Sequence, residues 1–228
     1  MSGLTLLLLF FGVPMIIGVV IQSRLRKTFA RNSKIPISTG KSGADVAREI
    51  LDRNGLRAVP VQASKAGPLS DHYDPRKRGI YLSQPVYEGR SVASTAVAAH
   101  EVGHALQHAN AYVPMTLRSA VWPLASFGQQ AWFFLLIGGV ILNIAGLITL
   151  ALVVFGFAVL FHLVTLPVEF NASRRAAIQL SELGLVTNDA EAAGVRQTLS
   201  AAAMTYVAGA LAAVSQLLYF LMIFGGRD

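Results

Sequence analysis

Residues 119–168 read "SAVWPLASFGQQAWFFLLIGGVILNIAGLITLALVVFGFAVLFHLVTLPV" and contain no Lys, Arg, Asp or Glu. A membrane core about 30 Å thick is crossed by about 20 apolar residues in a helix. The stretch is therefore too long for one upright span, and its length fits two helices. A turn near "NIAG" (143–146) would divide it into a helical hairpin, which enters and leaves the membrane on the same side.

Two further spans are expected at 4–22 and 203–224, which gives four transmembrane helices. A cleaved signal peptide is the alternative for the first span, but no Lys or Arg precedes it and no small-x-small cleavage site follows it. The basic stretch "RLRKTFAR" (24–31) directly after this span favours an N-terminus outside and a cytoplasmic exit. With four crossings, both termini are expected outside.

The composition also indicates a membrane protein. Of the 228 residues, 54% are hydrophobic and only 14% are charged, whereas soluble domains carry about 25% charged residues. The net charge of +7 comes mostly from Lys and Arg between residues 24 and 118, as expected for cytoplasmic segments beside membrane spans. Aromatic and basic residues are not interleaved as in a base-stacking surface, so the expected partner is the lipid bilayer and not nucleic acid.

Two charged regions are expected outside the lipid, at 24–118 and 169–200. The first contains an amphipathic helix starting after Ser42, strand candidates at 58–63 and 79–83, and a helix over about 91–110. The second contains amphipathic helices. The expected fold is a mainly α integral membrane protein with a small α+β zincin-like cytoplasmic or interfacial domain that contains a short β-hairpin or sheet.

The helix over about 91–110 carries the sequence "AVAAHEVGHALQH" (96–108). Residues four apart lie on one helix face, so His100 and His104 can bind one Zn²⁺. Glu101 would then lie beside the open metal position, where it can deprotonate metal-bound water and protonate the leaving amine. The chain contains no cysteine, so a third ligand must be His, Asp or Glu. We expect one Zn²⁺ per chain.

Glu169 is the favoured third ligand. His108 lies about 12 Å of helical rise beyond His100, too far to bind the same ion on a continuous helix. His162 lies inside an apolar span, where a packed or hydrogen-bonded histidine is expected. Glu169 is the first charged residue after the uncharged stretch, and a hairpin returns it to the side of His100 and His104.

Four segments resemble a known family. "HEVGH", followed beyond a membrane hairpin by "VEFNAS", is similar to the HtpX and CAAX prenyl protease group of membrane gluzincins. The segments "SGADVAREILDRNGL", "LSDHYDPR", "VAAHEVGHALQH" and "LVTLPVEFNASRRA" more closely resemble the YugP-like neutral zinc metallopeptidases of bacterial membranes. The likeness covers most of the chain.

The resemblance implies that His100, His104 and Glu169 are zinc ligands and that Glu101 is the catalytic base. The HtpX-like pattern has an Asp four residues after the Glu ligand, which can orient a zinc-bound histidine. This chain has Ser173 there, and a neutral hydroxyl orients a histidine less strongly than a carboxylate does. Asn171 is a candidate to share that role.

The oxyanion formed during peptide hydrolysis needs a further donor. Candidates are His72 and Tyr73 in "SDHYDPRKR" (70–78), and Arg174 or Arg175. The alternative for "DHYDP" is a polar turn that closes a hairpin. An exposed strand edge near 59–63 or 79–83 could bind an extended substrate by strand addition, as in the related peptidases.

The expected function is a membrane-embedded zinc metalloendopeptidase that acts on membrane-associated or misfolded proteins. We expect it in the bacterial inner membrane with its site facing the cytoplasm; a homo-oligomer or another membrane partner stays open. A non-catalytic scaffold with a structural metal is one alternative, but structural sites need four ligands. A site-2-type intramembrane protease is another, which the absence of Asp between residues 75 and 188 disfavours.

Overall fold

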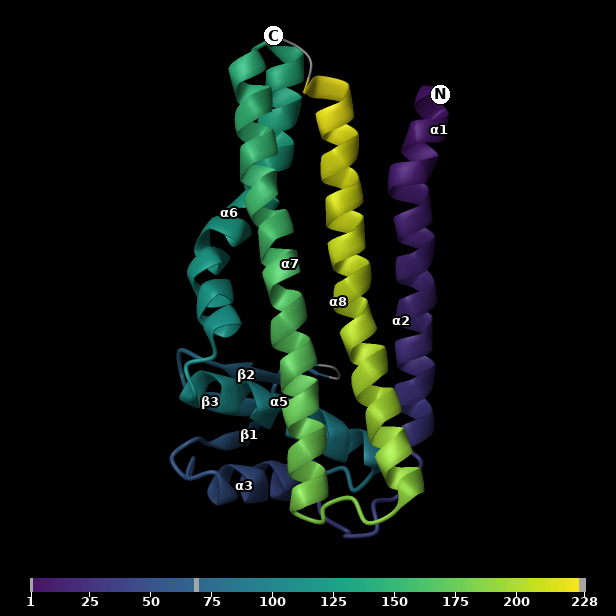
Figure 1. Cartoon of the computed structure of the whole chain (residues 1–228), viewed down its shortest axis with the longest axis vertical. Helices are drawn as coiled ribbons and strands as arrows, with labels where there is room; N and C mark the ends of the chain where they lie inside the picture. The colour runs from purple at the N-terminus through teal and green to yellow at the C-terminus, as the bar shows by residue number, and fades with distance from the viewer. Residues whose placement is uncertain (1, 68–69, 226–228) are drawn as a thin grey trace. The chain divides into compact units, whose positions relative to one another are not determined.

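The chain is mainly helical with one small sheet, and the computed structural model describes residues 2–67 and 70–225 (Figure 1). Within these residues, four helical stretches are long and apolar enough to cross a membrane, which confirms the predicted number of spans. They are Gly3–Asn32, formed by α1 (Gly3–Leu7), a π-helical turn η1 (Leu8–Gly12) and α2 (Val13–Asn32), then α6 (Val113–Ile141), α7 (Ala145–Glu182) and α8 (Asp189–Phe224).

The chain divides into two compact units. The first contains the residues up to 22, 113–167 and those from 205 onward. It has a buried apolar cluster, which packs against partly buried apolar side chains. The cluster contains Phe155, Ala158, Val159 and Ala213, and the side chains around it are Trp132, Val214, Leu217 and Phe220. Many large apolar side chains of this unit are exposed, which is expected where the solvent is lipid. The break between α6 and α7 places Asn143 in the left-handed region, at φ 53°.

The second unit contains residues 23–112 and 168–204. After the end of α2, its next helix, α3 (Gly43–Arg53), begins with a capping box in which Ser42 and Asp45 each bind the other's backbone N–H. The apolar face predicted for this helix is buried: Val46, Ala47, Ile50 and Leu51. Gly55, at φ 73°, reverses the chain after the helix.

Three strands form the sheet of this unit in the order β1-β3-β2: β1 (Val61–Ala63), β2 (His72–Asp74) and β3 (Gly79–Leu82). β1 pairs parallel to β3 and β2 pairs antiparallel, so Val61 and Tyr73 both lie opposite Ile80. The sheet confirms the small β element expected from the sequence.

The segment "DHYDP" contains both a strand and the start of the turn that was its alternative interpretation. His72–Asp74 forms β2, and the chain turns over residues 75–78. Asp74 Oδ1 accepts hydrogen bonds from the backbone N–H groups of Arg76 and Lys77, at 2.8 and 3.1 Å, which fixes this turn. Residues 68–69 of the same turn-rich segment lie outside the described residues.

Helix α5 (Val92–Ala109) follows the short helix α4 (Gln84–Tyr87) and carries the His-Glu-x-x-His motif. Ser91 and Ser94 form its N-terminal capping box. Most of the helix is buried, and small residues let other segments approach closely. At Gly103, an added Cβ would lie 2.5 Å from the carbonyl oxygen of Ala172 on α7. This approach brings the charged part of α7 against the motif helix.

Candidate metal centre

His100 and His104 of α5 and Glu169 of α7 meet at one point of the second unit. Their ligand atoms all lie within 4.8 Å of one another. Glu169 Oε2 lies 3.2 Å from His100 Nε2 and 3.5 Å from His104 Nε2. Glu169 is 2% exposed, so these two imidazoles face a carboxylate that is shielded from water. The three residues predicted as ligands are therefore brought together.

The outer nitrogen of each histidine is also engaged. His104 Nδ1 lies 3.0 Å from Gln107 Oε1, and His100 Nδ1 lies 3.2 Å from Ser173 Oγ. A partner on Nδ1 fixes the orientation of the ring and leaves Nε2 for the metal, which is the usual arrangement around metal-bound histidines. Ser173, the residue that replaces the Asp of the related pattern, thus reaches His100.

Asn171 lies further from the histidines than the sequence led us to expect. Its Oδ1 accepts hydrogen bonds from Gln107 Nε2 at 3.0 Å and from Arg175 Nε at 2.8 Å. It therefore reaches His104 only through Gln107, a residue that sequence reasoning did not single out.

The donor set fits Zn²⁺. Two imidazole nitrogens and one carboxylate oxygen are ligands that zinc binds in proteins, and catalytic zinc sites have three protein ligands with a fourth position open. The buried carboxylate of Glu169 further favours a cation among these groups. The carboxyl group of the residue that follows His100 is close enough to this cluster to interact electrostatically with His100 and Glu169.

That residue, Glu101, is 7% exposed. Its pKa is raised to about 7: burial is the largest cause and the charges of Glu169 and Asp71 act in the same direction, while His100 and the backbone N–H of Tyr73 act against them. A carboxyl group that exchanges a proton near neutral pH can act as a general acid–base. The bond from Tyr73 also places strand β2 next to this carboxylate.

Three of the four candidate oxyanion donors, His72, Tyr73 and Arg174, occupy different environments. Tyr73 is buried, and its Oη lies 2.7 Å from Nδ1 of His108 on α5. Its neighbour His72 points to the opposite face of β2, because side chains alternate along a strand. There the ring of His72 is exposed and stacks on Tyr81, with centroids 5.0 Å apart. Arg174 is exposed on α7. Tyr73 is therefore the one among them that lies against α5.

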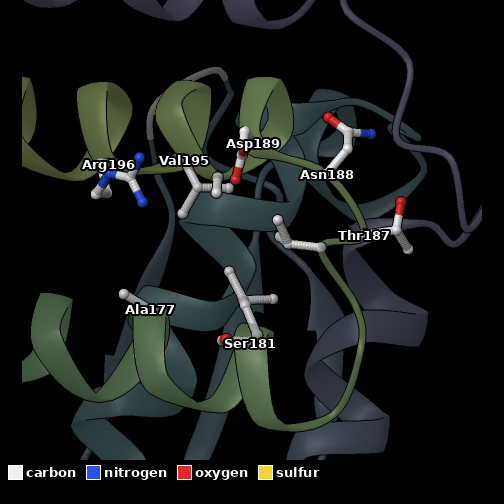
Figure 2. Close-up of a pocket in the computed structure, with 10 residues that line it drawn as sticks. Ala177, Ser181, Thr187, Asn188, Asp189, Val195 and Arg196 are labelled. Carbon is white, nitrogen blue, oxygen red and sulfur yellow. The ribbon is translucent and has the colours of Figure 1, made fainter.

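A cavity of about 260 Å³ lies in the second unit between the end of α7 and the start of α8 (Figure 2). Its lining includes Ala177, Ser181, Asn188, Asp189 and Arg196. None of the residues lining it belongs to the histidine–glutamate cluster. The candidate metal centre therefore lies outside this cavity.

Comparisons with known proteins identify relatives of this chain. The model of a family described as "Putative neutral zinc metallopeptidase" matches residues 7–225. The chain is 48% identical over 208 residues to a protein named "Putative membrane protease YugP" from Bacillus subtilis (strain 168); the match covers 91% of this chain and 92% of that protein. No solved structure matches the chain.

Proposed function

Since the chain belongs to this neutral zinc metallopeptidase family, as its motifs predict, we propose that it is a membrane-embedded endopeptidase that uses one Zn²⁺. The observation that carries the proposal is the convergence of His100, His104 and Glu169, with ligand atoms within 4.8 Å of one another. The cluster combines the three-ligand set of a catalytic zinc site with a carboxylate, Glu101, that is not one of the three.

His100, His104 and Glu169 would hold the metal. When bound, Zn²⁺ supplies Lewis-acid polarisation of the scissile carbonyl and lowers the pKa of water. In this role each imidazole would bind as a neutral ring, because the ligating nitrogen must offer its lone pair to the metal.

Glu101 would act as the general base. Its carboxylate accepts a proton from the attacking water and later gives it to the amine that leaves. Burial keeps bulk water away from this carboxylate, and its electrostatic interactions with His100 and Glu169 indicate that it lies near the proposed ligands. The backbone N–H of Tyr73, in strand β2, donates a hydrogen bond to this carboxylate and helps to hold it in place.

Strand β2 is the proposed substrate-binding edge. It lies at one end of the sheet order, and within residues 2–67 and 70–225 no strand pairs with its outer side. An extended peptide could add to this edge through backbone hydrogen bonds, with its scissile bond next to Glu101. Of the candidate oxyanion donors we retain Tyr73, because burial raises the pKa of its phenol and keeps it a donor.

The proposed substrates are membrane-associated or misfolded proteins of a bacterial cell. The chain is a membrane protein: its described residues include four helices long and apolar enough to cross a membrane, and its relative carries the name "Putative membrane protease". The Lys and Arg residues concentrated between 24 and 118 favour a cytoplasmic location for the metal centre. As part of the same proposal, the protein lies in the inner membrane of that cell.

The test compares the purified full-length protein in detergent with its Glu101→Gln variant. Metal content is measured by elemental analysis and proteolysis with a labelled, unfolded protein substrate. We expect about one zinc per chain in both proteins and a loss of activity of about 100-fold or more in the variant. Full activity of Glu101→Gln, or a wild type that binds no metal, would overturn the proposal.

A further inference from the structure

Gln107 is a buried polar residue to which the proposed chemistry gives no role. It lies three residues after His104 on α5 and is 0% exposed. Its side chain makes three contacts: Oε1 lies 3.0 Å from His104 Nδ1, and Nε2 donates to the carbonyl oxygen of Val168 at 2.7 Å and to Asn171 Oδ1 at 3.0 Å. It therefore bridges the motif helix and the segment of α7 that contains Glu169.

These contacts determine which end of the Gln107 amide faces His104. The backbone oxygen of Val168 can only accept a hydrogen bond, so the amide nitrogen must face it. Asn171 gives the same answer, because its Oδ1 also accepts from Arg175 Nε and so is the oxygen end of that side chain. The oxygen of Gln107 is left for His104.

The tautomer of His104 follows from this orientation. An amide oxygen accepts only, so His104 Nδ1 must carry the hydrogen. A neutral histidine with hydrogen on Nδ1 has its lone pair on Nε2. That is the nitrogen 3.5 Å from Glu169 Oε2, so the lone pair faces the place where the ligands converge.

His100 is held less strictly. Its Nδ1 faces the hydroxyl of Ser173 at 3.2 Å, and a hydroxyl can either donate or accept. This contact orients the ring without deciding its tautomer. Gln107 differs in a second way, because its acceptor Val168 directly precedes Glu169. One side chain therefore holds both His104 and the helical turn of α7 that contains Glu169.

We propose that Gln107 is a positioning residue: it holds His104 as the Nδ1–H tautomer and fixes Glu169 against it, and thereby sets the affinity of the site for metal. The inference rests on the proposed function in that His104 and Glu169 are taken as metal ligands. A purely structural Gln107 would instead join α5 to α7 without affecting metal affinity beyond its effect on folding.

The first experiment measures Zn²⁺ affinity of the full-length protein in detergent by competition with a chelator. Gln107→Leu should weaken binding by 10- to 100-fold, the usual effect of removing the partner of a metal-bound histidine. Gln179→Leu is the matched control, because Gln179 also joins two helices, accepting from Asn54 Nδ2 at 2.5 Å, but lies away from the cluster. The control should bind Zn²⁺ like the wild type. The visible spectrum of the Co²⁺-loaded protein should change in Gln107→Leu only.

The second experiment needs no folded Gln107 variant. Nitrogen chemical shifts of ¹⁵N-histidine in the metal-free wild type report the tautomer of each ring, and a His104→Gln variant assigns the signal. We expect hydrogen on Nδ1 of His104. An Nε2–H tautomer, or unchanged Zn²⁺ affinity in Gln107→Leu, would overturn the inference. A wild type that binds Zn²⁺ with the expected tautomer but cleaves no protein would overturn the proposed function alone.

Discussion

Gly103 of α5 lies so close to Ala172 of α7 that a Cβ at position 103 would be 2.5 Å from the Ala172 carbonyl oxygen and 3.1 Å from its Cα. Gly103 directly precedes His104, and Ala172 lies between Glu169 and Ser173. The missing side chain thus sets how near the third ligand and the partner of His100 come to the histidines. The obstacle that an added Cβ would meet is backbone, which cannot rotate away as a side chain can.

Gly103→Ala should therefore disrupt the metal centre. The added methyl group must push α7 away or strain α5, and overpacking of this kind costs about 1–3 kcal/mol. We expect a lower melting temperature of the metal-free protein and at least a 10-fold loss of Zn²⁺ affinity. Gly138→Ala is the control, because a Cβ at that helical glycine would meet nothing within 4 Å. Equal Zn²⁺ affinity of the two variants would contradict the prediction.

Glu169→Gln should remove the charged ligand with little change of shape. Loss of a ligand is expected to weaken Zn²⁺ binding by about 100-fold or more, beyond the 10- to 100-fold typical of an outer partner. Elemental analysis after gel filtration should then find well below one zinc per chain. The control is Glu182→Gln, at the exposed end of the same helix, which should retain the metal. Full zinc content in Glu169→Gln would show that the third ligand lies elsewhere.

Ser173 offers a third prediction, since its hydroxyl is the partner of His100 Nδ1. Ser173→Ala should reduce Zn²⁺ affinity by about 10-fold, and Ser173→Asp should restore or exceed wild-type affinity, because a carboxylate orients a histidine better and raises its basicity. Chelator competition on both variants measures the order. If Ser173→Ala bound zinc more tightly than Ser173→Asp, the hydroxyl would not be orienting His100.

The fourth prediction concerns pH and the capping box of α3. Hydrogen bonds from the side chain and backbone of Ser42 hold the pKa of Asp45 below its ordinary value of 3.8. A carboxyl group with a lowered pKa in the folded state stabilises the fold above its ordinary pKa, and this stability is lost as the pH falls through the folded-state pKa. The benefit of Asp45 should thus be present at pH 6 and decline below pH 3.8.

Melting temperatures of the metal-free protein, compared with Asp45→Asn from pH 6 to pH 3, would measure this effect. Metal-free protein is needed because zinc binding itself depends on pH. The difference between the two proteins should shrink toward pH 3. Ser42→Ala should lose about 1 kcal/mol of stability near neutral pH, as caps usually do, and should show less of the same pH dependence. A difference that stays constant with pH would contradict the assignment.

The sequence predicts well whatever depends on local pattern. The four spans follow from long uncharged runs, and the buried face of α3 follows from apolar residues at helical spacing after a capping serine. The pairing of His100 and His104 follows from their four-residue spacing. In each case residues close together in the chain determine the outcome.

Contacts between distant residues are predicted less well. Strand β2 has only three residues, of which His72 is exposed and Tyr73 is buried, and turn-forming residues flank it. Its alternating pattern is therefore too short to identify it as a strand from the sequence. Gln107 reaches Val168 across 61 residues, and nothing in the spacing reveals which buried glutamine will meet which carbonyl. Glu169 could be inferred because the hairpin limits which side of the membrane it returns to.

The order of the ligands along the chain has a consequence for biosynthesis. His100, Glu101 and His104 are translated before the apolar stretch 119–168, and Glu169 only after it. A growing chain that has not yet synthesised both arms of the hairpin lacks the third ligand, and with it a complete zinc site. A complete set of the proposed ligands therefore exists only once the chain has been synthesised beyond its own hairpin.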